Sequence, residues 1–355
     1  MVLKSSTPLS AGLGLTLPFA EPPEIGQVRE VAPGILWTRI PLPFRLDHVN
    51  IYLIEDGDGW AVLDTGIADD PTRSTWQALL AGPLAGRRLT RLIITHFHPD
   101  HIGLAGWLCE QFDLPLLTSL SSYLGCLNIS LNPEAKEAKP YRDFYLGHGM
   151  APETADLVAT RGQAYLRMVT PLPPTFTRVV AEQVLLIGGR EFEVLFGDGH
   201  APDQLMLYCA SDNIFLPADQ VLAKITPNIS VWEVDPDGDP LGLYLRSLNM
   251  ITKRIPADAL VLPGHQLPFR GLHVRCQELV DHHEERCARV AKACRIKPHS
   301  VADLVPVLFT RPLDPHQLSF AFSETHAHVN AMLHRGELVW TEAREGMTRT
   351  VIARA

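Results

Sequence analysis

The order of strands and helices along this chain of 355 residues predicts an α/β fold in which two mixed sheets pack face to face, with helices on the outside. Hairpin strands followed by strand–helix units occur twice, on either side of the proline cluster at 171–174. A composition of 46% apolar and 20% charged residues excludes a largely disordered chain. Apolar runs stay shorter than the roughly 18 residues of a membrane span, so a membrane partner is not expected.

Short apolar runs bounded by turn residues mark the strands of both halves. In the first half, a helix is expected over 71–80 and strands at 34–40, 49–54, 60–63 and 92–94. In the second half, a helix is expected over 240–254 and strands at 176–187, 191–196, 205–209, 213–217 and 260–262. Between the halves, 119–170 is expected to be a helical insertion that lies over the functional site.

The segment 273–297 is predicted to be one long helix, because its apolar, Cys and His residues recur every three or four positions. This stripe consists of Cys276, Val280, His283, Cys287, Val290 and Cys294. Cys287 and Cys294 would lie about 10 Å apart along a helix, which is too far to share one ion. The stripe therefore predicts buried packing and not a metal site.

The end of the chain resembles a small winged-helix module. A helix is expected over 301–309, a second over 324–335 with Ser323 as its N-cap and Gly336 just after its end, and a hairpin over 338–342 and 348–352. The predicted domains are an N-terminal tail (1–29), a catalytic domain (30–271) and a C-terminal helical, winged-helix-like domain (272–355). The C-terminal module would suit a docking or dimerisation surface, so a homodimer stays open.

Charge and cysteine usage bear on the partners and the compartment. The net charge is −9, and residues 297–355 carry six basic and six acidic side chains, so nucleic acid is not favoured as a partner. Six Cys without a CxxC pair predict reduced thiols and a cytoplasmic protein. The apolar stretch 9–20 follows a single Lys and is interpreted as an ordinary tail, not as a signal peptide.

A histidine-rich string directly follows the apolar run 92–94. Residues 95–101 read Thr-His-Phe-His-Pro-Asp-His. His96 and His98 would point to the same side of an extended backbone, and Asp100 and His101 would begin the next helix. Imidazole nitrogens combined with a carboxylate suit Zn(II), with Fe(II) and Mn(II) as alternatives. The string therefore predicts a metal site.

Three further strands are followed by residues of the same ligand types: His200, Asp219 and His265. Because these side chains would meet at one rim of a sheet sandwich, we expect all seven to contribute to one site. The sequence resembles the metallo-β-lactamase superfamily, in particular its glyoxalase II-like branch. The resemblance rests on the H-x-H-x-D-H string, on the order His200, Asp219, His265, and on the turn Asp64-Thr65-Gly66. The resemblance covers roughly residues 30–270.

The resemblance implies an αβ/βα sandwich with two divalent metal ions. By position, one ion would be held by His96, His98 and His200, and the other by Asp100, His101 and His265. Asp219 would bridge both ions, and Asp64 would orient a ligand from behind. Two departures from the family pattern could reshape the edge of the pocket: Ala218 stands where Gly usually precedes the bridging Asp, and Ala-Pro-Asp follows His200.

A two-metal site predicts hydrolysis by a metal-bridging hydroxide that attacks a carbonyl centre in a thioester, ester or lactone. Asp100 and Asp219 are the predicted catalytic residues, and Asp100 could pass a proton to an alkoxide. The substrate is expected to be a small molecule. The candidate pocket residues are His48, Tyr145, His148, Lys224 and Asn228.

Two other functions stay open at this stage. A nuclease or phosphodiesterase would combine the same signature with a winged helix, although no basic stripe supports it. A mononuclear iron dioxygenase acting on a thiol or persulfide would need one iron with open positions, whereas this chain offers a complete second set of ligands.

Overall fold

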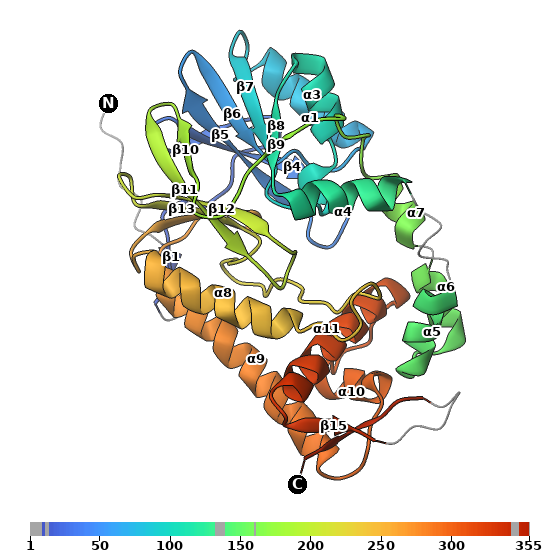
Figure 1. Ribbon diagram of the computed structural model, residues 1–355. Helices are drawn as coiled ribbons and strands as arrows, with labels where there is room; N and C mark the ends of the chain where they lie inside the picture. The colour runs from blue at the N-terminus through green and yellow to red at the C-terminus, as the bar shows by residue number, and fades with distance from the viewer. Residues whose placement is uncertain (1–8, 11–13, 132–138, 160, 342–347, 355) are drawn as a thin grey trace.

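Two mixed β-sheets pack face to face, and helices cover both outer faces (Figure 1). The computed structural model describes residues 9–10, 14–131, 139–159, 161–341 and 348–354. Among the described residues, no helix is both long and apolar enough to cross a membrane. The predicted fold class is confirmed.

The first sheet has seven strands in the order β3-β4-β5-β6-β7-β8-β9. Its strands from β3 to β6 are antiparallel, and β6 to β9 are parallel. Their bounds are β3 Arg29–Ala32, β4 Ile35–Pro41, β5 His48–Asp56, β6 Gly59–Leu63, β7 Arg88–Ile93, β8 Leu116–Thr118 and β9 Thr177–Arg178. A two-residue turn at 57–58 joins β5 and β6.

The second sheet has five strands in the order β10-β11-β12-β13-β14, antiparallel except for the parallel pair β13 and β14. Their bounds are β10 Val184–Ile187, β11 Arg190–Gly197, β12 Gln204–Cys209, β13 Ile214–Ala218 and β14 Leu260–Pro263. The core between the sheets includes Trp37 and Phe192, both fully buried. The predicted continuous strand over 176–187 is wrong, because the chain crosses between the sheets there and Glu182 has a positive φ of 65°.

Helices α1 (Asp70–Ala81), α2 (Pro99–Ile102) and α3 (Ala105–Phe112) follow strands of the first sheet, and α8 (Pro240–Arg254) and α9 (Leu272–Cys294) lie on the second. Asp69 caps α1 by accepting a hydrogen bond from the backbone of Thr72, as its position before a helix predicts. Trp76 of α1 is fully buried and donates a hydrogen bond from Nε1 to the carbonyl of Thr65. This contact fixes the loop after β6.

The insertion is helical, as predicted, and its helices contact two different parts of the molecule. Its helices are α4 Leu120–Leu131, α5 Lys139–Gly147, α6 Pro152–Ala159 and α7 Arg161–Leu166. Helices α4 and α7 contact each other beside the first sheet, whereas α5 and α6 lie beside the C-terminal helix α11 (Pro315–His334) (Figure 1). The insertion thus connects the catalytic body to the C-terminal part.

The C-terminal part contains α9, α10 (Val301–Leu308), α11 and a two-stranded sheet of β15 (Leu338–Trp340) and β16 (Val351–Ala353). Helix α11 starts nine residues before the predicted start at 324, because Asp314 caps it and Pro315 occupies its first turn. Ser323 is therefore a buried residue inside the helix and not its N-cap. Gly336 has a φ of 72°, which agrees with its predicted place just after the helix. Part of the predicted hairpin, at 342, lies outside the described residues.

The stripe of α9 is buried, as its spacing predicts. All of its members are buried except Val280, which is half-buried, and all six cysteines of the chain are free and buried. Within the described residues, no metal-binding group is found on α9. His283 instead lies 3.1 Å, Nδ1 to Nε2, from His328 of α11, and both rings are fully buried.

Burial makes this histidine pair a source of acid sensitivity. Burial lowers the pKa of His283 to about 2 and that of His328 to about 3, and the nearby cation of Arg286 acts in the same direction on both. Histidines in an unfolded chain protonate near pH 6.5. Because the unfolded chain binds more protons than the folded chain below that pH, the free energy of unfolding falls as the pH falls.

We expect His283→Gln to reduce the pH dependence of stability between pH 6.5 and 4.5. A histidine that stays neutral in the folded state accounts for up to about 2.7 kcal/mol over two pH units. Urea unfolding at both pH values measures the slope, and His334→Gln, at an exposed position on α11, is the control. A slope equal to that of the wild type would mean that His283 has the same pKa in the folded and the unfolded chain, which would contradict the prediction.

Candidate metal centre

Four loops that follow buried strands bring the seven candidate ligands together. The string 96–101 comes after β7, His200 follows β11, Asp219 directly follows β13 and His265 follows β14. Asp100 and His101 lie on the short helix α2, as the sequence predicts. The carbonyl of Thr95 accepts a hydrogen bond from the backbone of Leu205 in β12, so the two sheets are tied together beside the site.

Three imidazoles form the first cluster. The distance from Nε2 of His96 to Nδ1 of His98 is 3.0 Å, and Nδ1 of His98 is 3.0 Å from Nε2 of His200. Burial lowers the pKa of all three, that of His98 to about 3, and the neighbouring histidines lower those of His96 and His98 further. Three neutral nitrogens that converge on one point are suited to bind a cation.

The second cluster combines two imidazoles with Asp100. Nε2 of His265 lies 3.3 Å from a carboxylate oxygen of Asp100, and Nε2 of His101 lies 3.7 Å from the same oxygen. Within each cluster, the candidate ligand atoms lie within 4.8 Å of one another.

Asp219 lies between the two clusters and contacts both. Its carboxylate is 3.1 Å from His265 and 3.4 Å from His101 on one side, and 3.5 Å from His200 on the other. His96, His101 and Asp219 also form a group that could hold a metal ion. Asp219 therefore lies between the two clusters, and the bridging role that the resemblance implies for it stays a prediction.

Opposite charges balance each other in the second cluster. Burial disfavours the charged form of His265, but the carboxylates of Asp219 and Asp100 outweigh it and raise its pKa to about 10. The same carboxylates raise the pKa of His101. Burial would raise the pKa of Asp219, yet the two imidazolium groups hold it well below its usual range. A cation bound here would displace these protons, so metal binding is expected to release them.

Two buried ligand atoms have no hydrogen-bond partner. They are Nε2 of His101 and Oδ1 of Asp219, which form an ion pair with each other at 3.4 Å but no hydrogen bond. Buried polar atoms are normally paired, because an unpaired one costs roughly 1–3 kcal/mol. Both atoms face the cluster, and nitrogen combined with carboxylate oxygen is the donor set that zinc and similar divalent ions use. The residues present therefore fit a metal ion.

In each candidate ligand histidine except His98, the ring nitrogen that points away from the cluster has a partner that orients the ring. These pairs are His101 Nδ1 with the Asp64 carboxylate at 2.8 Å, His265 Nδ1 with the His48 carbonyl at 2.7 Å, His200 Nδ1 with the Asn228 carbonyl at 2.9 Å, and His96 Nδ1 with the Thr95 hydroxyl at 2.9 Å. Asp64 in turn accepts hydrogen bonds from the backbone and the hydroxyl of Thr95. Such contacts fix the tautomer and aim the inner nitrogen at the metal position.

The backbone around the candidate ligands is strained. Asp64, Ala218 and Gln266 have φ values of 65°, 48° and 69°, in the left-handed region that disfavours side chains with a Cβ. The value at Ala218 explains the glycine that the family pattern has there. Gly264 is needed for another reason, because a Cβ on it would lie 2.2 Å from Oδ1 of Asp219. Strain of this kind is typical of functional sites.

The predicted pocket residues separate into two groups. The backbone carbonyls of His48 and Asn228 contact the candidate ligands His265 and His200. Lys224 is exposed, and its backbone N–H donates a hydrogen bond to Oε1 of Gln266, the residue after His265. Tyr145 and His148 contact helix α11. The Tyr145 ring lies 5.9 Å from that of Phe322, and the His148 ring lies 4.3 Å from that of His326. The Tyr145 hydroxyl also donates a hydrogen bond of 2.9 Å to Glu233, in the segment that follows Asp219.

Some contributors were missed by sequence reasoning. Thr95 and Gly264 directly precede candidate ligands, and that adjacency is the signal that could have identified them. Tyr165 in α7 donates a hydrogen bond of 2.6 Å to the carbonyl of Phe97, between two ligands. No local pattern indicates this contact, because it joins segments 68 residues apart.

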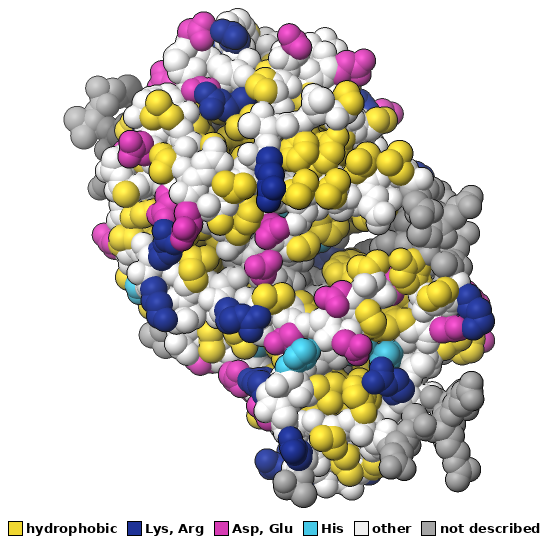
Figure 2. Space-filling model, in the orientation of Figure 1, with side chains coloured by type: hydrophobic (Ala, Val, Ile, Leu, Met, Phe, Trp, Pro, Cys, Tyr) yellow, Lys and Arg dark blue, Asp and Glu magenta, His cyan; other side chains and the backbone are white. Residues whose placement is uncertain are grey.

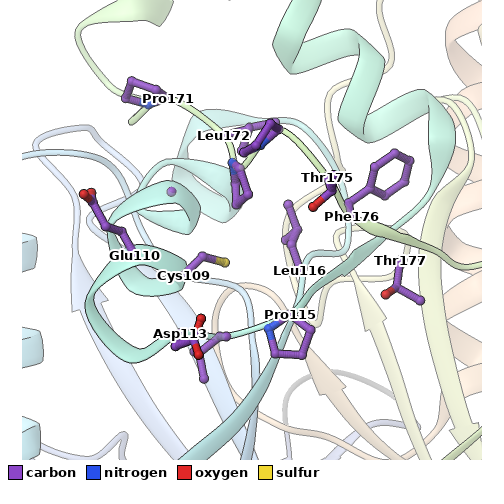
Figure 3. A pocket seen from close by; sticks show the side chains of 14 residues that line it. Cys109, Glu110, Asp113, Pro115, Leu116, Pro171, Leu172, Thr175, Phe176 and Thr177 are labelled. Atoms are coloured by element: carbon purple, nitrogen blue, oxygen red, sulfur yellow. The ribbon is translucent and has the colours of Figure 1, made fainter.

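A cavity of about 540 Å³ lies between α3 and the proline-rich segment 171–177 (Figure 3). None of the seven candidate ligands lines it. Burial raises the pKa of the Cys109 thiol in its wall to about 12, so the thiol stays protonated. The cavity therefore offers neither metal ligands nor a reactive thiolate.

Comparisons with known proteins agree with the fold. The family model of the metallo-beta-lactamase superfamily matches residues 44–265, and that of the metallo-beta-lactamase-like C-terminal domain matches 287–352. A beta-lactamase domain protein from Burkholderia ambifaria has a similar structure, with a TM-score of 0.86 and 36% identity over 96% of this chain and 97% of that one.

Two further relatives cover most of the chain. The structure of a metallo-beta-lactamase family protein from Thermus thermophilus has a TM-score of 0.77 and 25% identity, over 92% of this chain and all of that one. The probable metallo-hydrolase YqjP of Bacillus subtilis is 23% identical over 84% of this chain and 92% of its own length.

We expect Gly264→Ala to weaken zinc binding by about 10- to 100-fold, because the new Cβ pushes the Asp219 carboxylate out of position. Isothermal titration with zinc measures the affinity. Gly147→Ala is the matched control, since a Cβ there has no atom within 4 Å. Wild-type affinity in the Gly264 variant would show that Asp219 is not a ligand.

Proposed function

Because the chain belongs to the metallo-β-lactamase superfamily, we propose that it is a hydrolase that holds two divalent metal ions, zinc in the first place. One ion would be bound by His96, His98 and His200, and the other by Asp100, His101 and His265. Asp219 would bind both. The observation that carries this proposal is the position of the buried Asp219 carboxylate between two complete clusters.

The proposed reaction is hydrolysis at a carbonyl centre of a thioester, ester or lactone, as in the glyoxalase II-like branch. Bound divalent ions would supply an acidified water near neutral pH and polarise the carbonyl oxygen. The protein keeps its ligand nitrogens neutral in the first cluster and its two carboxylates ionised. This chemistry needs no serine or cysteine nucleophile, and the G-x-S-x-G string is absent from the sequence.

Asp100 has a second role in this proposal. Its side chain is 20% exposed, more than that of Asp219 at 8%, so it faces the open side of the centre. Burial would raise the pKa of Asp100, but His101 and His265 hold it below its usual range, so the carboxylate is available to accept and relay a proton. A thiolate leaving group needs no proton, which favours thioesters among the carbonyl substrates.

Metal analysis tests the site itself. We expect about two zinc ions per chain after reconstitution. We expect Asp219→Ala to lower the zinc content and to reduce kcat by at least about 100-fold, because the carboxylate of Asp219 would position both ions. Elemental analysis and circular dichroism separate loss of metal from loss of fold. A single iron accompanied by oxygen consumption would favour the dioxygenase alternative and contradict the proposal.

A substrate panel tests the reaction class. We expect the zinc-loaded protein to turn over acyl thioesters or lactones, and bis(p-nitrophenyl) phosphate at least about tenfold more slowly. The reason is that the proposed site acts on a carbonyl centre, and the balanced charge of residues 297–355 gives no separate support for a nuclease. Turnover of the phosphodiester alone would replace the proposal with a phosphodiesterase.

A further inference from the structure

His98 differs from the other candidate ligand histidines in how its ring is held. Each of the other four has a hydrogen-bond partner on the ring nitrogen that points away from the cluster. In His98 the inner nitrogen is Nδ1, which lies 3.0 Å from Nε2 of His96 and 3.0 Å from Nε2 of His200. Its outer nitrogen, Nε2, has no hydrogen-bond partner among the described residues. Contacts outside the ring must therefore aim His98 at the metal position.

The peptide groups on both sides of His98 are fixed instead. The carbonyl of His98 accepts hydrogen bonds of 3.0 Å from the backbone N–H groups of His101 and Ile102 in α2. On the other side, the carbonyl of Phe97 belongs to the peptide group that includes the N–H of His98, and it accepts a hydrogen bond of 2.6 Å from the Tyr165 hydroxyl. Because peptide groups are planar, holding both of them fixes the backbone of His98 and the direction in which its side chain leaves the backbone.

Tyr165 reaches this peptide group from the insertion. It lies on α7, which contacts α4, and α4 packs against the Phe97 ring, because a Cβ added at Gly125 would be 3.3 Å from that ring. The Phe97 ring in turn lies 5.1 Å from the ring of His98. Figure 2 shows that hydrophobic side chains gather on the face that carries α4. The hydrogen bond of Tyr165 is partly buried, and such a bond is stronger there than in open water.

We propose that Tyr165 is a positioning residue for the first cluster: through the peptide group between Phe97 and His98, its hydroxyl aims the His98 imidazole at the metal position. It takes the part that a direct hydrogen bond plays for the other four imidazoles. This inference rests on the proposed function, because it needs a metal ion in the first cluster. Removing a partner that orients a ligand lowers metal affinity by about 10- to 100-fold, although the partner never touches the ion.

Zinc titration of the full-length, metal-free protein tests this role. In a His265→Ala background, which disables the second cluster, we expect Tyr165→Phe to weaken zinc binding about tenfold or more. Tyr123→Phe is the matched control, because the Tyr123 hydroxyl on α4 donates a hydrogen bond of 2.8 Å to the carbonyl of Pro173, which is not on a ligand loop. Both variants lose one hydrogen bond from a tyrosine to a carbonyl, so a purely structural role predicts equal effects. Isothermal titration measures the affinities, and urea unfolding compares the losses of stability.

The second cluster supplies the complementary test. In a His98→Ala background the remaining zinc is held by the second cluster, and we expect Tyr165→Phe to change its affinity by less than about twofold. An equal loss in both backgrounds would show that Tyr165 supports the whole site and does not act through His98, which would overturn the inference. Equal affinities of Tyr165→Phe and Tyr123→Phe at the first cluster would overturn it as well, while the proposed function would stand.

A readout without metal separates this inference from the proposed function. In metal-free protein with isotope-labelled histidine, we expect one sharp ring signal for His98 in the wild type and a broadened or doubled signal in Tyr165→Phe, because the ring loses its single orientation. The signal is assigned by its absence from His98→Ala. If the wild type binds no zinc, the proposed function fails. An unchanged His98 signal in Tyr165→Phe would then overturn the positioning role too, whereas a doubled signal would support it.

Discussion

The buried carboxylate of Asp219 is the constraint around which the rest of the site is arranged. An ionised carboxylate in a protein interior is costly unless cations or hydrogen bonds compensate it. Here imidazoles approach from both clusters, and one oxygen is left without a hydrogen-bond partner. The positive charge that satisfies this oxygen is supplied by protons or by divalent ions, and the geometry of two converging clusters favours ions.

The scaffold gives up local backbone stability to hold this arrangement. Asp64 and Ala218 adopt left-handed conformations, and Gly264 leaves room for the Asp219 carboxylate. Such strain costs about 1–3 kcal/mol per residue and persists only where the surroundings fix it. The two sheets provide these surroundings, because Asp219 and His265 follow fully buried strands and the carbonyl of Thr95 joins one sheet to the other.

The insertion links this centre to the rest of the molecule. Its helix α4 lies on the metal loop, while α5 and α6 lie on the C-terminal helix α11. The C-terminal part is therefore attached to the surroundings of the centre through one continuous segment. Its own interior is built from the buried stripe of α9 and the histidine pair with α11, which is packing and not a second metal site.

The sequence by itself determined the fold class and the ligand types. Strand runs are local features formed by neighbouring residues, so their positions followed from local chemistry, as for the strands expected at 60–63 and 260–262. The start of α11 was misjudged, because two cap signals, Asp314 and Ser323, compete within nine residues and local chemistry does not rank them.

Tertiary structure decided which residues that are far apart in the sequence come into contact. The contact between Tyr165 and Phe97, the partner of each imidazole and the exposed side of α4 join segments remote in sequence, and no periodicity encodes them. It also brought Tyr145 and His148 into contact with helix α11. Residue types set which chemistry is available, and packing sets which of those residues meet.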